Sequence, residues 1–193
     1  MLSWRVGTSR AYAAGNWRGY AVYRDGVVLN IDDHAAIMDK KNISATRPVL
    51  HSGGYNGVVQ RGTWADFVGG SDSKNKYLGL YKPNNCYITQ RTGDLIVAKA
   101  RELLGTRYSL LRQITYSAGS NTWVRPENIL GLRCDGVVEY VYEWFGWRVG
   151  GSDSNWNISR NKAANLLQHS GFSITPRKQH EKLLKLVSSS LPN

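Results

Sequence analysis

Short apolar segments separated by turn residues fill the first half of the chain, and this pattern predicts β-strands. Gly19–Arg24 and Val27–Ile31 flank Asp25-Gly26, a dipeptide typical of two-residue hairpin turns. Further strand-like or short apolar pieces follow at His34–Met38, Val49–Ser52, Val58–Gln60, Trp64–Val68 and Tyr77–Tyr81. Glycine pairs and a Pro-Asn-Asn sequence end several of them, so we expect an antiparallel sheet.

The second half shows the 3.6-residue spacing of apolar positions that is typical of helices. Asp94–Leu104 predicts one helix and Asp135–Phe145 a second, each followed by a glycine that suits a helix end. Two more helices are predicted at Arg160–His169 and Gln179–Val187. The long polar and aromatic segment Tyr108–Arg133 is expected to be a functional loop.

This order of elements predicts an α+β fold, with an antiparallel sheet from the N-terminal half and helices packed on it from the C-terminal half. A length of 193 residues suits one domain with a real core, so residues 1–193 are expected to form a single domain and a monomer. Residues 1–18 are expected to be a polar extension, and residues 172–193 a basic helix and tail.

The composition narrows the partners that can be expected. The chain has 25 Lys and Arg against 14 Asp and Glu, a net charge of +11, which attracts polyanions. The basic residues are scattered rather than clustered, so we expect no nucleic-acid partner, whereas an anionic cell wall or lipid remains open. The chain has no run of eighteen apolar residues, so no transmembrane segment is expected. The start of the chain lacks the apolar segment of a signal peptide, so either the protein is cytoplasmic or it is secreted and begins after a removed export signal.

Cys134 is the candidate nucleophile because it lies one residue before the predicted helix Asp135–Phe145. A helix N-terminus stabilises a thiolate, the nucleophilic form of cysteine, and its amide groups can bind an oxyanion. The alternative is an inert, buried Cys134. Cys86 lies in a polar turn and is interpreted as an incidental thiol, with a disulfide to Cys134 left open.

Two of the four histidines lie in strand-like segments and are candidate bases for such a thiol. If the segments holding His34 and His51 are neighbouring strands, one imidazole can accept the thiol proton while the other orients the first. The alternative is that both are structural. His169 and His180 are expected to be solvated.

Metal binding is the rival chemistry for this part of the chain. The candidate ligands are Asp32, Asp33, His34 and His51. No His-x-x-x-His spacing exists, and adjacent residues of a strand point to opposite faces, so no metal or other cofactor is expected.

The residues around Cys134 resemble a known family. Arg133-Cys134-Asp135-Gly136, followed by an apolar helix, resembles the nucleophile segment of NlpC-type papain-like cysteine peptidases, and Ala98–Tyr108 resembles their lead-in helix and turn. Because His34 and His51 precede the cysteine, the order is similar to the circularly permuted branch, which includes YaeF/YiiX-type amidases and, more distantly, lecithin retinol acyltransferases. The resemblance covers about residues 19–146 and implies a permuted papain-like fold.

The resemblance also implies roles for individual residues. Cys134 would be the nucleophile, His34 the general base, and His51 the residue that orients His34. Tyr108 would line the site near the oxyanion position. Trp123, in an unusually long interval before the cysteine, and Asp135 are expected to contact substrate. Arg133 departs from the acidic or aromatic residue that is common in the family, which leaves the substrate open.

These roles predict a hydrolase that cleaves an amide bond in bacterial cell-wall peptide through a thioester, with a peptide or a lipid-linked amide as substrate. Two alternatives remain. The same thioester can serve an acyltransferase or a lipid esterase, and a basic, Trp-rich domain can be a non-catalytic module that binds polysaccharide or another polyanion.

Overall fold

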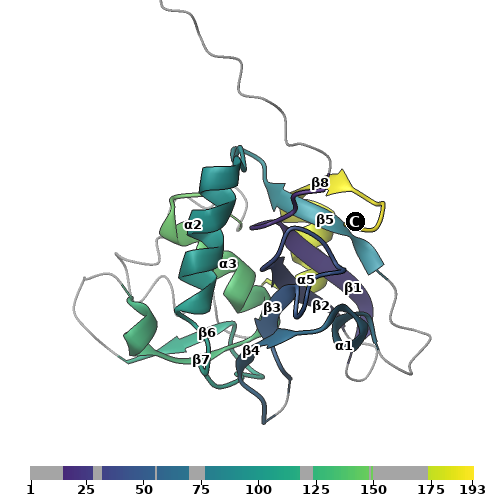
Figure 1. Ribbon diagram of the computed structural model, residues 1–193. Coiled ribbons are helices and arrows are strands. Elements are labelled where there is room, and N and C mark those ends of the chain that lie inside the picture. Colours follow the sequence, from purple (N-terminus) through teal and green to yellow (C-terminus); the bar gives the residue numbers. More distant parts are fainter. Residues whose placement is uncertain are drawn as a thin grey trace, which may run out of the picture.

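Antiparallel pairing joins six strands into one sheet with the order β4-β3-β2-β1-β5-β8 (Figure 1). The computed structural model describes residues 15–27, 32–54, 56–69, 77–117, 124–147, 149 and 174–193. The six strands are β1 (Ala21–Val27), β2 (Asp32–Met38), β3 (Val49–Ser52), β4 (Val59–Gly62), β5 (Tyr77–Pro83) and β8 (Leu184–Ser188). A separate pair is formed by β6 (Ile114–Tyr116) and β7 (Ile129–Leu132). The predicted α+β class, with a mostly antiparallel sheet, is therefore confirmed.

Helices cover both faces of the six-stranded sheet. In Figure 1, α2 (Gln90–Arg101) and α3 (Cys134–Trp144) lie on one side of it, and the short α1 (Trp64–Val68) lies on the other. The described residues include three further short helical segments: η1 (Pro126–Asn128), α5 (Pro176–Lys178) and the single π-turn η2 (Gln179–Leu183). Because β2 is covered on both faces, every residue from Asp33 to Met38 is buried.

Helix α3 is held unusually deep in the protein, since its first ten residues are all buried. Gly136 permits this position. A Cβ atom on Gly136 would lie 2.1 Å from the carbonyl oxygen of Gln113, so any larger residue would push the start of α3 away from the strand pair β6-β7.

The N-terminal strands differ from the sequence prediction in one hairpin and one helix. Strand β1 runs through Asp25-Gly26 to Val27, so the chain does not turn at that dipeptide. The segment Trp64–Val68, predicted as an apolar strand-like piece, is the helix α1 instead. The side chain of Thr63 caps it by accepting a hydrogen bond from the backbone N–H of Asp66.

The C-terminal half contains more strand than the sequence predicted. Gln179–Val187 was expected to be one helix, but the chain makes η2 and then pairs with β5 as β8. The expected loop Tyr108–Arg133 contains β6 and β7. The helix predicted at Arg160–His169 lies outside the described residues, as does most of the predicted extension 1–18.

Candidate active site

The two strand histidines are in direct contact. Nε2 of His34 lies 2.8 Å from Nδ1 of His51, and the two rings meet edge to face at 86°. His34 comes from β2 and His51 from β3, which are neighbouring strands of the sheet. The condition stated from the sequence, that the segments holding His34 and His51 are neighbouring strands, is therefore met.

The strand register explains why these rings meet. Ile37 of β2 pairs with Leu50 of β3, so His34 and His51 occupy diagonal positions on the same face of the sheet. Strands β2 and β3 pair at Ile37–Leu50 and at the neighbouring Met38–Val49. His34 and His51 both lie just beyond these paired residues.

A phenylalanine covers the imidazole pair. The ring of Phe67, from α1, lies 5.7 Å from the ring of His34 and 6.0 Å from that of His51. Strand alternation places Tyr23 and Asp33 on the opposite face of the sheet. There the Tyr23 hydroxyl donates a hydrogen bond to Gln179, whose side chain in turn donates to the backbone carbonyl of Asp135 in α3.

Burial keeps both imidazoles neutral over the physiological range. The pKa of His51 is lowered to about 4, first by burial and then by the charge of Arg24. The pKa of His34 is lowered well below its usual range, first by burial and then by His51 and Arg24. A neutral imidazole can accept a proton, which is the property a general base needs.

Gly62 of β4 makes room for the second imidazole. A Cβ atom at this position would lie 2.8 Å from Nε2 of His51, closer than ordinary contacts of 3.4 Å or more. The sheet thus fixes His51 from two sides: His34 contacts one ring nitrogen, and the backbone of Gly62 lies against the other.

Cys134 is the first residue of α3, as expected for a thiol at a helix N-terminus. It is 5% exposed. Arg133 immediately before it forms a bidentate ion pair with Asp135, at 2.7 and 2.8 Å, and also donates to the carbonyl of Ile174. This ion pair anchors the residues on both sides of the cysteine.

One cavity of about 900 Å³ is lined by the candidate nucleophile, both candidate histidines and the candidate tyrosine. Cys134, His34, His51 and Tyr108 all line it. Charged residues in its wall are Arg24, Asp33, Arg47, Arg61, Asp66 and Arg133. Apolar side chains in its wall are Val59, Leu104, Leu110, Leu111 and Pro176.

Backbone contacts with Leu132 and Gly57 position Tyr108 at this cavity. It forms a parallel bridge with Leu132, two residues before Cys134, and its backbone N–H donates to the carbonyl of Gly57 at 2.9 Å. The two residues expected to contact substrate are placed differently. Asp135 is fully buried against Arg133 and does not line the cavity, and Trp123 lies outside the described residues.

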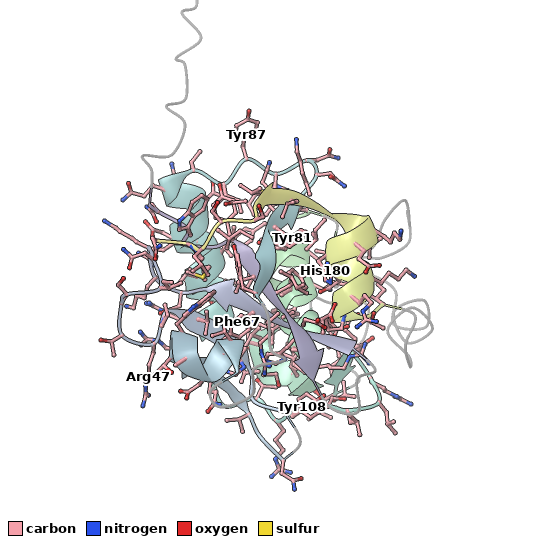
Figure 2. The ribbon with its side chains drawn as sticks, turned by 90° about the vertical axis from the view of Figure 1, so that its right-hand side faces the viewer. Arg47, Phe67, Tyr81, Tyr87, Tyr108 and His180 are labelled. Carbon is pink, nitrogen blue, oxygen red and sulfur yellow. The ribbon has the colours of Figure 1, made fainter. Side chains whose placement is uncertain are left out.

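The structure adds residues that the sequence did not single out. Arg24 and Phe67 surround the imidazole pair, and neither carries a recognisable motif. His180 was expected to be solvated, but its Nε2 lies 2.6 Å from a carboxylate oxygen of Asp33, and its ring packs against Tyr81 (Figure 2). Arg177 also donates to Asp33, so the C-terminal segment is bound to β2 beside the site.

The two cysteines differ in their surroundings. Both are free, so no disulfide occupies Cys134. Cys86, interpreted from the sequence as an incidental thiol in a polar turn, is fully buried, and burial raises its pKa to about 11. Among the described residues, no group of three or more metal-ligating side chains is suited to a metal ion, and no helix is long and apolar enough to cross a membrane.

Comparison with protein families, curated proteins and solved structures finds no match for this chain.

Proposed function

We propose that the protein is a cysteine hydrolase that cleaves an amide bond through a thioester intermediate. One observation carries the proposal: a cysteine at the start of a helix shares a cavity with a hydrogen-bonded pair of neutral histidines. This combination supplies a nucleophile, a base and a group that orients the base.

The contact between the histidines suggests which nitrogen acts. If Nε2 of His34 donates its hydrogen to Nδ1 of His51, then Nδ1 of His34 is left as the proton acceptor. In the proposed reaction this nitrogen takes the proton of the Cys134 thiol, and the thiolate attacks the carbonyl carbon of the amide. The C–N bond breaks, and the His34 imidazolium returns the proton to the departing amine.

Water completes the cycle. His34 accepts a proton from a water molecule, whose oxygen attacks the thioester; the C–S bond breaks, the acid leaves, and the proton returns to the sulfur. The N-terminus of a helix presents backbone N–H groups to an oxyanion, and those at the start of α3, with the Tyr108 hydroxyl, are the proposed oxyanion donors.

The resemblance of Cys134 and its neighbours to NlpC-type peptidases supports cell-wall peptide as the substrate, outside the cytoplasm, and a permuted papain-like arrangement. The order of two strand histidines followed by a helix-start cysteine agrees with it. The charge of +11 is compatible with an anionic wall.

A second candidate function is favoured by three leucines at the cavity. Leu104, Leu110 and Leu111 line it and are 43%, 45% and 69% exposed. Exposed leucines suit an acyl chain, so cleavage or transfer of a lipid acyl group through the same thioester is the alternative. Assays on liposomes beside assays on cell-wall peptides separate the two substrates.

The decisive experiment measures the alkylation rate of Cys134 by iodoacetamide from pH 4 to 10, with mass spectrometry reporting each cysteine. We expect Cys134 to react with an apparent pKa well below the free value of about 8.5. The His34→Ala variant should return it toward that value. Ordinary thiol behaviour in both proteins would refute the hydrolase, and so would full hydrolysis of cell-wall peptides by Cys134→Ala.

A further inference from the structure

Strand β4 forms one edge of the six-stranded sheet, and all four of its residues line the cavity of the candidate active site. Its inner side pairs with β3, where Gln60 lies opposite His51 and Gly62 lies opposite Val49. The outer side of an edge strand carries backbone groups that can pair with another extended segment. A segment that paired with the outer side of β4 would therefore lie at this cavity.

The chain itself already uses the first part of this outer edge. The backbone N–H of Val59 donates to the carbonyl of Thr106 at 2.7 Å, and the carbonyl of Val59 accepts from the N–H of Gly105 at 2.9 Å. Val58, just before β4, forms an antiparallel bridge with Arg107. A short extended segment of the chain therefore runs antiparallel to β4 beside Val59.

That segment does not continue along β4 to Arg61. The chain enters it at Gly105, which has a φ of 85°, directly from the turns that end α2. Backbone hydrogen bonds of an antiparallel pair alternate between the two sides of a strand, so the N–H and C=O of Arg61 point outward, as those of Val59 do. Within the described part of the chain neither group has a hydrogen-bond partner, although the Arg61 side chain pairs with Asp39. The outer edge at Arg61 is therefore open to one more extended segment.

We propose that the substrate binds at this edge as an extended peptide, antiparallel to β4. One of its residues accepts a hydrogen bond from the N–H of Arg61 and donates one to the carbonyl of Arg61. Main-chain bonds of this kind supply the affinity when a sheet edge recognises a peptide. A lipid acyl chain has no such row of donors and acceptors, so this edge favours a peptide substrate over a lipid. Cleavage of the bound peptide at Cys134 rests on the proposed function, whereas binding at the edge does not.

The strand register also states which side chains of the peptide face the imidazole pair. Residues opposite each other in an antiparallel pair share a face, and successive residues alternate between faces. The peptide residue opposite Arg61 shares the face on which that arginine pairs with Asp39. Its two neighbours lie opposite Gln60 and Gly62, on the face that carries His51. Gly62 adds no side chain to that face, so nothing from this position separates the peptide from the ring.

A matched pair of variants tests the proposed donor. Arg61→Pro lacks the outward N–H and is suited to an edge strand, whereas Arg61→Ala keeps the N–H and loses the same side chain. In both variants Asp39 retains its two bonds to Arg101. In a Cys134→Ala background, NMR titration with N-acetyl-tetraalanine amide should give a Kd about threefold or more weaker for Arg61→Pro than for Arg61→Ala, because one hydrogen bond is lost. Equal affinities, or no binding to the protein with Arg61 intact, would overturn the proposal.

Hydrogen exchange supplies a test that needs no substitution at Arg61, should the proline variant unfold. The amide of Arg61 should exchange rapidly in the free protein, and saturating peptide should slow its exchange. The same peptide N-methylated at every amide has no N–H to donate and should leave the exchange rate unchanged. Rapid exchange that persists with the first peptide, or equal slowing by both, would overturn the proposal. Peptide binding with an unreactive Cys134 would refute the hydrolase and retain this binding edge, and a reactive Cys134 without peptide binding would do the reverse.

Discussion

Substitution of Gly62 by alanine tests the arrangement of the imidazole pair without touching either histidine. The new Cβ atom would lie 2.8 Å from Nε2 of His51 and 3.3 Å from its Cδ2. Ordinary contact begins at 3.4 Å, so the ring has to move by about 0.6 Å. It cannot move toward His34, which is already 2.8 Å away, and must tilt or turn. Either movement disturbs the hydrogen bond between the two rings.

The expected cost follows from the hydrogen bond. A net contribution of about 0.5–1.5 kcal/mol is typical of one such bond. Each 1.36 kcal/mol changes a rate tenfold, so the loss predicts an alkylation rate of Cys134 at neutral pH that is about 2- to 13-fold lower. The assay is the second-order rate constant with iodoacetamide, followed by mass spectrometry of the peptide that contains Cys134.

A double-mutant cycle separates this effect from general damage. In a His51→Ala background there is no ring to displace, so Gly62→Ala should have no further effect on the rate. An unchanged rate in the single variant, or an equal loss in both backgrounds, would refute the orienting role of His51. The temperature of unfolding, measured beside it, shows whether the sheet itself has been disturbed.

Three further predictions concern the charges around the site. The pKa of His51 is about 4 in the folded protein and about 6.5 when unfolded, so its contribution to stability is fully present above pH 6.5 and is lost as the pH falls toward 4, by about 3 kcal/mol. In chemical unfolding from pH 4 to 7, His51→Gln should flatten this dependence of stability on pH. An unchanged slope would contradict the assignment. Burial raises the pKa of Glu139 to about 8, so this residue destabilises the protein increasingly as the pH rises above 4.5. The variant Glu139→Gln can still accept hydrogen bonds from Gln113 and Gln179, and it should be more stable than the parent protein at pH 8.5 but not at pH 4. A loss of stability at both pH values would show that the carboxyl group has another role. Asp33→Asn weakens the hydrogen bonds to Arg177 and His180, so it should lower the free energy of unfolding by about 1–3 kcal/mol and speed hydrogen exchange in residues 174–193. Unchanged exchange in these residues would show that the carboxylate does not hold the segment.

The placement of His34 and His51 on neighbouring strands could be predicted from the local apolar pattern and from the order of the strands along the chain. The apolar runs around His34 and His51 are typical of buried strands, and strands that follow each other in sequence commonly pair. The start of α3 at Cys134 could be predicted from the apolar spacing that follows it. The distance between the two rings could not, because it depends on the register of β2 against β3 and on the conformations of the two side chains.

The errors have physical causes of a different kind. The helix α1 has five residues, too few for a helical period to show, and its start depends on the capping side chain of Thr63. In Gln179–Val187 the apolar residues fit a helical spacing, but the edge of β5 offers backbone hydrogen bonds that turn the last part into a strand. Arg24 resembles any other strand arginine until the register places it across from His34.

The bonds between Asp33 and the C-terminal segment have a consequence for the order in which the protein is made. Asp33 is synthesised 144 residues before Arg177 and 147 before His180. At about 5–20 residues per second, this strand waits roughly 7–30 seconds for the two side chains that bind its buried carboxylate. Pro176, from the same late segment, also lines the cavity, so this part of the wall forms only after the segment has been made. A nascent chain that already displays both histidines therefore still lacks part of the cavity wall.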